Sequence, residues 1–254
     1  MVHARPFSFM DEAISVALPA PLPSTSSGPD RSVHLFELRS LQSNWYQTLV
    51  QGDSDDPLPD ATSFKWEMCR QMRAWHEKLP ADLATSLREM LDLELRFSYV
   101  YLLAPSPRAP HLTEYGRALI FEHAIAYVHQ MHLVTEAGSR ASFYTYHDAL
   151  KVFFMGSQFV AVLRDAAESI LSPLPPTVPV QSPQPAPPPF PPKLDGGHDN
   201  IDRSLQTLEK VGLNLVKFGQ RWDYAQQLLG TFEMISKEVA DSLRMRKEAS
   251  YGQE

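Results

Sequence analysis

Apolar side chains recur every three or four residues along most of this chain, and they almost never alternate one by one with polar side chains. The first spacing places them on one face of an α-helix, whereas a half-buried strand needs alternation. The sequence therefore predicts an all-α protein, an irregular multi-helix domain of about seven helices with a proline-rich disordered insertion. The predicted helices span about 33–49, 63–79, 87–102, 113–138 and 142–171, and two more follow residue 198.

Short polar side chains stand where several of these helices are expected to begin. Ser63 and Thr113 are predicted to cap the second and fourth helices, and Asp30 or Ser32 is predicted to cap the first. A side-chain oxygen at such a position accepts a hydrogen bond from a backbone N–H that has no partner within the helix.

The fourth and fifth predicted helices carry apolar residues around most of their circumference, which is typical of helices at the centre of a domain. Gly156 lies in the middle of the fifth helix, where glycine costs about 1 kcal/mol relative to alanine. We therefore expect a neighbouring helix to approach closely at Gly156. The last two helices also carry apolar stripes, and we expect them to pack back onto the fourth and fifth.

Proline accounts for eleven of the twenty residues from Pro173 to Pro192. Such a segment is incompatible with helix and sheet ladders and favours an extended polyproline conformation. We interpret it as a spacer, with recognition by an aromatic-lined groove as the alternative. The predicted organisation is an extended segment (1–32), a helical core (33–171), a proline-rich linker (172–198), a terminal helix pair packing back on the core (199–243) and a tail (244–254).

The overall charge argues against direct binding to nucleic acid. The formal net charge is −7, whereas a surface that binds phosphates needs concentrated Lys and Arg. One compact basic cluster occurs, at 244–247, and we interpret it as cations placed against the C-terminal dipole of the last helix. No DNA-binding residue is predicted.

Cys69 is the only cysteine in the sequence, so an intramolecular disulfide is impossible and a reducing compartment is expected. One thiolate also cannot hold a cluster of two zinc ions and six cysteines. No apolar run approaches the roughly 20 residues that span a bilayer, and no membrane association is predicted.

Three histidines on the fourth predicted helix invite a metal-site interpretation. His129 and His132 are one turn apart and could converge on an ion, but His123 is almost two turns from His129 and no cysteine or acidic residue completes a known ligand spacing. We interpret them as surface or partly buried histidines. No metal-ligating residue and no cofactor are predicted.

His147, Asp148 and Ser157 invite comparison with a hydrolase triad. Ser157 is expected within a helix rather than at the strand-to-helix elbow that exposes a nucleophile, and its neighbours do not form Gly-x-Ser-x-Gly. Phosphate-cradling glycine motifs are absent from the sequence. We predict no catalytic residue and no enzymatic activity.

Large aromatic residues lie on the predicted helical stripes, and we interpret them as core rather than as a ligand box. They include Trp45, Trp75, Phe153, Phe154 and Trp222. If a pocket for a small effector exists, we expect it between the fourth, fifth and seventh helices, where apolar residues are most abundant.

Several segments are informative when they are taken together and in order. Arg5-Pro6 and the stretch Asp11–Pro19 precede a helix that begins His34-Leu35 and contains Gln42-Ser43. The segments that follow are Phe64-x-Trp66, Trp75–Pro80, Leu93–Pro107, Tyr146–Leu150 and Leu215–Ala225. This order resembles the carboxyl-terminal half of the middle homology region of fungal binuclear zinc-cluster transcription factors.

The resemblance implies a nuclear transcription regulator that controls a biosynthetic (secondary-metabolite) or catabolic gene cluster through protein contacts. Its partners would be other transcription regulators or a second copy of itself, and DNA would be reached only indirectly or through an amino-terminal zinc cluster. We expect this chain to correspond to the regulatory half without that cluster. A free-standing α-helical interaction module without a transcriptional role is the alternative, and a small helical enzyme is the third hypothesis.

Overall fold

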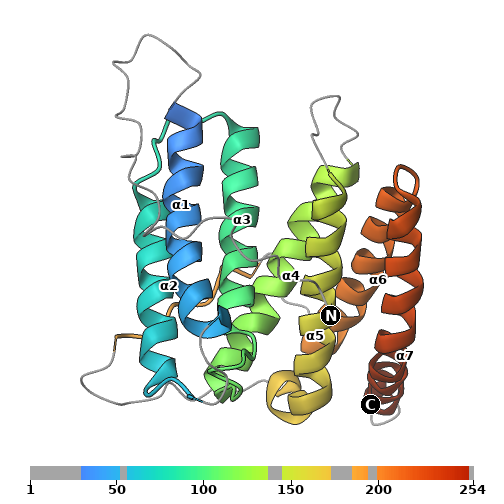
Figure 1. Cartoon of the computed structure of the whole chain (residues 1–254). Helices are drawn as coiled ribbons and strands as arrows, with labels where there is room; N and C mark the ends of the chain where they lie inside the picture. Colours follow the sequence, from blue (N-terminus) through green and yellow to red (C-terminus); the bar gives the residue numbers. More distant parts are fainter. Residues whose placement is uncertain (1–29, 52–55, 137–144, 173–184, 194–198, 252–254) are drawn as a thin grey trace. The chain divides into compact units, whose positions relative to one another are not determined.

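The computed structural model describes residues 30–51, 56–136, 145–172, 185–193 and 199–251 (Figure 1). These residues contain seven α-helices, one π-helical turn and no β-strand, and Ser106 and Ala109 form one isolated bridge. The predicted all-α fold is confirmed. Of the predicted extended segment and proline-rich linker, residues 1–29, 173–184 and 194–198 lie outside the described part of the chain.

The helices fall into two compact units, with a boundary between Leu112 and Thr113. This boundary divides the helices of the predicted core (33–171) between the units. The first unit holds α1 (Asp30–Tyr46), the π-turn η2 (Gln47–Gln51), α2 (Ala61–Glu77) and α3 (Thr85–Leu103). The second holds α4 (Glu114–Glu136), α5 (Tyr146–Leu171), α6 (Asn200–Gly219) and α7 (Asp223–Tyr251).

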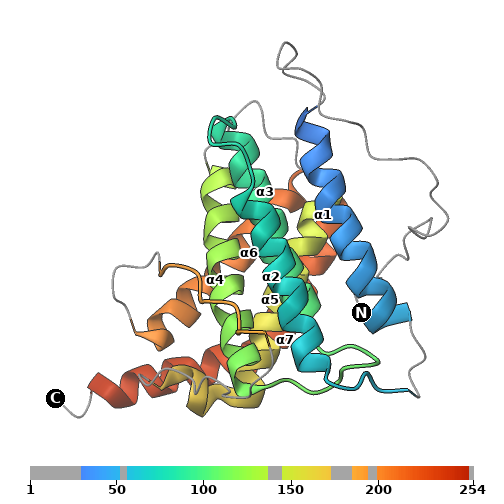
Figure 2. The same cartoon turned by 90° about the vertical axis from the view of Figure 1, so that its left-hand side faces the viewer.

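In the first unit, α1, α2 and α3 lie side by side and share one apolar core (Figures 1 and 2). Hydrogen bonds between buried groups fix the three helices. The Trp75 indole N–H of α2 donates to the His34 carbonyl of α1 at 2.8 Å, and the Gln42 amide of α1 donates to Ser98 Oγ of α3 at 2.6 Å.

The start of α2 corrects one prediction. Asp60, not Ser63, is the N-cap residue, and its carboxylate accepts a hydrogen bond from the Ser63 backbone N–H at 3.3 Å. Asp60 adopts a left-handed conformation with φ 54°, which short polar residues tolerate better than most. At the start of α4, Thr113 Oγ1 accepts from the Gly116 N–H at 3.0 Å, so that predicted cap is confirmed.

The first unit also buries a lysine. Lys65 of α2 is 6% exposed, and its ammonium donates to the carbonyls of Leu103 and Ala104 at 3.0 and 3.1 Å. These carbonyls belong to the C-terminal end of α3, where a helix carries partial negative charge. Burial nevertheless lowers the pKa of Lys65 to about 8, and burial raises the pKa of the neighbouring Cys69 thiol.

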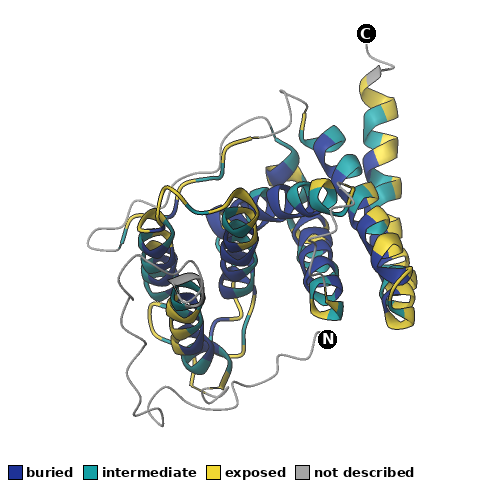
Figure 3. Cartoon of the chain, turned by 90° about the horizontal axis from the view of Figure 1, so that it is seen from above, coloured by how far each residue is buried: buried dark blue, intermediate teal, exposed yellow. Residues whose placement is uncertain are grey.

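In the second unit, α6 and α7 form a hairpin that packs on α4 and α5 (Figure 1), as their apolar stripes predict. Buried residues face the interior of the unit, and exposed residues follow the outer side of α7 (Figure 3). None of the described helices combines the length and the apolar character that crossing a bilayer requires.

At Gly156, α5 is approached closely by two neighbouring helices. A Cβ atom at that position would lie 2.8 Å from a ring carbon of Phe232 and 2.8 Å from a methyl carbon of Val211. The close approach expected at Gly156 is therefore confirmed, and both α6 and α7 take part in it.

The basic cluster near the end of the chain differs from its interpretation. α7 continues to Tyr251, through most of the predicted tail, so the cluster does not lie in the last helical turn. Its cations are paired with carboxylates instead, in the pairs Arg244–Asp241, Arg246–Glu168 and Lys247–Asp202, at 2.9, 2.5 and 2.7 Å. The placement against the helix dipole is wrong, and two of these pairs tie α7 to α5 and α6.

Candidate functional site

The face that α6 presents to α4 is polar along its length. Its residues recur every three or four positions on one side of the helix, and they are Asn200, Arg203, Thr207, Lys210, Asn214 and Lys217. Three of the α4 side chains that meet them, Glu122, His129 and Glu136, are seven residues apart. We call these nine residues the polar seam.

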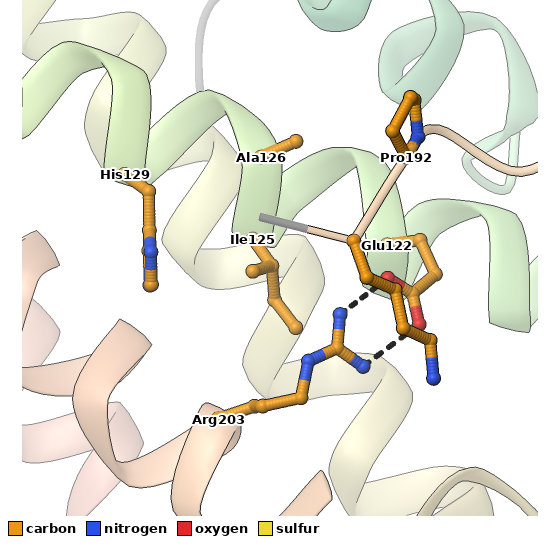
Figure 4. Close-up of a pocket in the computed structure, with 7 residues that line it drawn as sticks. Glu122, Ile125, Ala126, His129, Pro192 and Arg203 are labelled. Carbon is orange, nitrogen blue, oxygen red and sulfur yellow. Dashed lines mark hydrogen bonds and ion pairs between the residues drawn. The ribbon is translucent and has the colours of Figure 1, made fainter. Parts of the chain in front are cut away.

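The strongest contact in the seam is the ion pair of Arg203 and Glu122. The guanidinium of Arg203 donates to both carboxylate oxygens of Glu122, at 2.9 and 2.5 Å (Figure 4). The Arg203 side chain is 1% exposed and that of Glu122 is 12% exposed. The guanidinium also lies 5.6 Å from the ring centroid of Phe121. A bidentate pair of this kind fixes the relative position of two helices.

Asn200 extends this network to a third helix. Its side-chain oxygen accepts a hydrogen bond from Arg203 at 2.7 Å, and its side-chain nitrogen donates to the carbonyl of Ile170 in α5 at 2.6 Å. Glu122, Arg203, Asn200 and the end of α5 thus form one continuous chain of hydrogen bonds.

Further along the seam, His129 lies between Thr207 and Lys210. His129 Nδ1 is 3.2 Å from the Lys210 ammonium, and Nε2 is 3.4 Å from Thr207 Oγ1. The ammonium can only donate, so Nδ1 must accept and the ring proton sits on Nε2. This assignment is inferred from the partners of the ring. It leaves neither ring nitrogen of His129 available to a metal ion.

The other predicted histidines do not join His129 in a site. His123 is buried within the second unit and His132 is half-buried. Across the described ranges of the chain, no group of three or more His, Cys, Asp and Glu side chains is placed to hold a metal ion. The expectation that the chain holds no metal and no cofactor stays a prediction.

A small cavity adjoins the ion pair and is closed by the proline-rich segment. Its lining includes Glu122, Ala126, Arg203, Pro192 and Lys193 (Figure 4). The cavity volume is about 10 Å³, close to the minimum for a single water molecule. This cavity therefore has no room for an organic substrate.

The last residues of the proline-rich segment pack on α4. The ring of Phe190 lies 5.0 Å from that of Tyr115, and Tyr115 is 5% exposed. This burial raises the pKa of the Tyr115 hydroxyl. The described residues 189–193 thus contribute to the second unit, which the interpretation as a spacer does not anticipate.

The residues considered for a triad are not brought together. Asp148 is part of a capping box with Thr145 at the start of α5. Ser157 Oγ donates to the Phe153 carbonyl one turn earlier, at 2.8 Å. Nine residues separate Asp148 from Ser157, about 13 Å along a helix. His147 is exposed, so these side chains cannot act on one substrate atom in this arrangement.

Most of the aromatic residues that we assigned to the core are buried there. Trp45, Trp75 and Phe154 are buried, whereas Phe153 and Trp222 are half-buried. Trp222 forms a cation–π contact with Arg221 at 4.9 Å. For the three buried side chains, the assignment to the core is confirmed.

The predicted effector pocket was placed between the fourth, fifth and seventh helices. At Gly156, where α5 meets α7, the close contact with Phe232 leaves no space for a ligand. A groove of about 660 Å³ lies between α6 and α7, and the expected pocket between the fourth, fifth and seventh helices stays a prediction. Its floor is formed mainly by Leu205, Leu208 and Gly212 of α6 and by Phe232, Ser236 and Ala240 of α7. We call this the α6–α7 groove.

Comparison with protein-family models, with curated proteins and with solved structures finds no match to this chain.

The polar seam was missed in the sequence, although its signal is present there. The predicted apolar stripe of α6 consists of Ile201, Leu205, Leu208 and Leu215, and the polar residues repeat with the same spacing on the neighbouring face. Glu122, His129 and Glu136 repeat every seven residues in α4. Two polar repeats with matching periods indicate that two helices meet through them.

Proposed function

We propose that this chain is the helical regulatory part of a transcription regulator resembling the fungal zinc-cluster family. It acts in the nucleus through protein contacts and controls a biosynthetic or catabolic gene cluster. It has no catalytic role in this proposal, and it reaches DNA through a partner or through an attached DNA-binding module.

One observation carries the proposal. Three of the segments that resemble the family, those that contain His34, Trp75 and Ser98, are joined by hydrogen bonds in the first unit. His34 of the first segment accepts the hydrogen bond of Trp75 in the next, and Gln42 donates to Ser98 in the segment Leu93–Pro107. Residues that are far apart in sequence and share the family pattern are therefore hydrogen-bonded across the helix contacts of this unit. This supports a shared fold more strongly than scattered surface matches would.

The all-α architecture and the dispersal of His147, Asp148 and Ser157 are also consistent with a role in protein contact. The alternative, an interaction module without a transcriptional role, draws support from large apolar side chains that α6 and α7 leave exposed. Leu213 and Val216 of α6 and Tyr224, Met234 and Met245 of α7 are at least 43% exposed.

A tethering experiment tests the proposal. The full chain is fused to an unrelated DNA-binding domain upstream of a reporter gene, and transcript levels are compared with those given by the DNA-binding domain alone. We expect a change of at least about fivefold in either direction, equivalent to about 1 kcal/mol of recruitment free energy. A fusion that carries Lys217→Met, a variant expected to remain folded, is the matched control. No change with a folded fusion would contradict the transcriptional role.

Two further observations separate the proposal from the alternative. A tagged protein that is confined to the cytoplasm favours the interaction module. Translation of the transcript upstream of Met1 shows whether a six-cysteine cluster is joined in frame, and such a cluster would supply the DNA-binding module directly.

A further inference from the structure

No neighbouring side chain within this protein requires position 212 to be glycine. A Cβ atom there would meet only a methyl carbon of Leu229, at an ordinary distance of 4.0 Å. Glycine within a helix is nevertheless about 1 kcal/mol less favourable than alanine. Gly156 differs, because a Cβ atom there would collide with Phe232 and Val211. What the missing side chain of Gly212 does provide is depth in the α6–α7 groove.

The charged residues along the groove are of two kinds. Asp202, Arg244 and Lys247 at one end are already in ion pairs within this chain. Glu209 on α6 and Glu233 on α7 are exposed, and their side chains have no hydrogen-bond or ion-pair partner in the described part of the chain. The groove therefore combines a mixed apolar and polar floor with two unneutralised carboxylates, one on each wall.

From this geometry we propose that the α6–α7 groove binds a basic amphipathic helix of a partner protein. The apolar face of that helix lies over Leu205, Gly212 and Phe232, and its Lys or Arg side chains pair with Glu209 and Glu233. This inference rests on the proposed function, because it identifies the kind of partner through which the chain would act.

The dimensions of the groove favour a helix as the occupant. The α7 wall runs from Phe232 to Lys247, fifteen residues that span about 22 Å in a helix. A partner helix of about four turns matches this length, and its side chains at i, i+4, i+7 and i+11 follow the floor. A compact small molecule would cover only part of an open groove of this length.

The probe is a displayed library of 16-residue helices with Leu, Ile, Val or Phe at the a and d positions and all residues elsewhere. It is selected on the full chain after depletion on the Gly212→Leu variant, whose new side chain fills the groove. We expect enriched peptides to carry an excess of Lys and Arg over Asp and Glu beside the apolar stripe. Absence of enrichment, or enrichment of acidic peptides, would overturn the proposal.

Affinities of one enriched peptide then test the site residue by residue. We expect binding to weaken at least about tenfold on Gly212→Leu and on the double variant Glu209→Lys/Glu233→Lys, since opposed charges become like charges. Gly230→Leu and Glu238→Lys are the matched controls, because Gly230 has no atom within 4 Å of its Cβ position and Glu238 is exposed on α7 outside the groove lining. Equal loss on these controls would overturn the proposal.

Circular dichroism melts establish that each variant is folded before its affinity is compared. Testing the Gly212→Leu variant in the tethered reporter separates the two proposals. Peptide binding without any reporter response would leave the groove assignment standing and remove the transcriptional role. Conversely, a reporter response that Gly212→Leu does not change, in a chain for which no binding peptide is found, would leave the transcriptional role standing and remove the groove assignment.

Discussion

Arg203 of the second unit and Lys65 of the first are both buried cations, and their charges are accommodated differently. In the second unit, Arg203 is held by both oxygens of Glu122 and by Asn200. In the first unit, Lys65 has two carbonyl oxygens at the end of α3 as its hydrogen-bond acceptors. A guanidinium keeps its proton at all ordinary pH values, whereas an ammonium can lose its proton when it is desolvated.

The difference shows which kind of buried charge depends on a partner. Arg203 cannot become neutral, so its burial requires Glu122, and the pair in turn fixes α6 against α4. Lys65 can be buried with only the partial negative charge of the carbonyls at the end of α3 as its partner, because its pKa falls to about 8 and the side chain can lose its proton. Stability should therefore respond to partner removal in the second unit and to pH in the first.

The largest effect is expected from breaking the ion pair. Arg203→Met leaves the Glu122 carboxylate buried without its counter-charge and should lower the free energy of unfolding by about 3–5 kcal/mol. The double variant Arg203→Met/Glu122→Leu should recover most of that loss, because no unpaired charge remains. Urea denaturation followed by circular dichroism measures both.

The exposed end of the same seam supplies the control. Lys217 and Glu136 form an ion pair at 3.1 Å with both side chains more than two-fifths exposed, and Lys217→Met should change stability by less than about 0.5 kcal/mol. If Arg203→Met and Lys217→Met had the same effect, burial would not be what makes the Arg203 pair important.

The next effect is the pH dependence of stability that the buried Lys65 contributes to the first unit. The folded pKa of Lys65 is about 8, whereas the unfolded pKa is near 10.4. Between these values the unfolded chain binds a proton that the folded chain does not, so stability should rise with pH in this window. Relative to Lys65→Met, the wild type should gain up to about 3 kcal/mol between pH 8 and 10.5.

Cys69 allows this contribution to be isolated. Burial raises the pKa of its thiol in the folded state, so the unfolded chain loses that proton first and stability falls as pH rises above about 8.5. Cys69→Ala should remove this opposing term and so enlarge the net rise in stability of the chain with pH, whereas the term cancels from the difference between the wild type and Lys65→Met, which share Cys69. A pH-independent difference between the wild type and Lys65→Met would show that the Lys65 ammonium stays charged in the folded state.

A smaller effect is expected on the apolar side of α6, where Val211 contacts Gly156 of α5. Gly156→Ala forces Val211 and Phe232 to move by several tenths of an ångström, and overpacking of this kind costs about 1–3 kcal/mol. The gain in helix propensity offsets about 1 kcal/mol, so we expect a net loss of up to about 2 kcal/mol in thermal or urea unfolding. Gly230→Ala, with an open Cβ position, should instead stabilise by up to about 1 kcal/mol. Stabilisation by both variants would contradict the close approach.

The smallest effect concerns the proline-rich segment. Phe190→Ala removes the ring that packs on Tyr115 and should lower the stability of the second unit by about 0.5–1.5 kcal/mol. It should also make Tyr115 more accessible, which the quenching of tyrosine fluorescence by acrylamide detects. Pro192→Ala is the control, because Pro192 is exposed. Equal quenching in Phe190→Ala and the wild type would show that the contact does not protect Tyr115.

The sequence predicts the helices better than their ends. Periodicity identifies all seven, and the N-cap at Thr113 is confirmed. The start of α2 was misplaced because Asp60 and Ser63 are both suitable capping residues, and the choice between them depends on the left-handed backbone at Asp60. The end of α7 was placed too early because basic residues resemble a helix terminus, although here they form ion pairs with carboxylates, two of them on α5 and α6.

What the sequence determined by itself is what depends on neighbours along the chain: the all-α class, the seven helices, the break at the proline-rich segment and the need for space at Gly156. What only the tertiary structure decided is which side chains meet across long separations. Arg203 and Glu122 are 81 residues apart and Lys65 and Leu103 are 38 apart. The spacing of residues along a helix determines which of them share a face. Which other helix covers that face is determined by the packing of the whole unit. The polar seam, the buried lysine and the α6–α7 groove all follow from that packing.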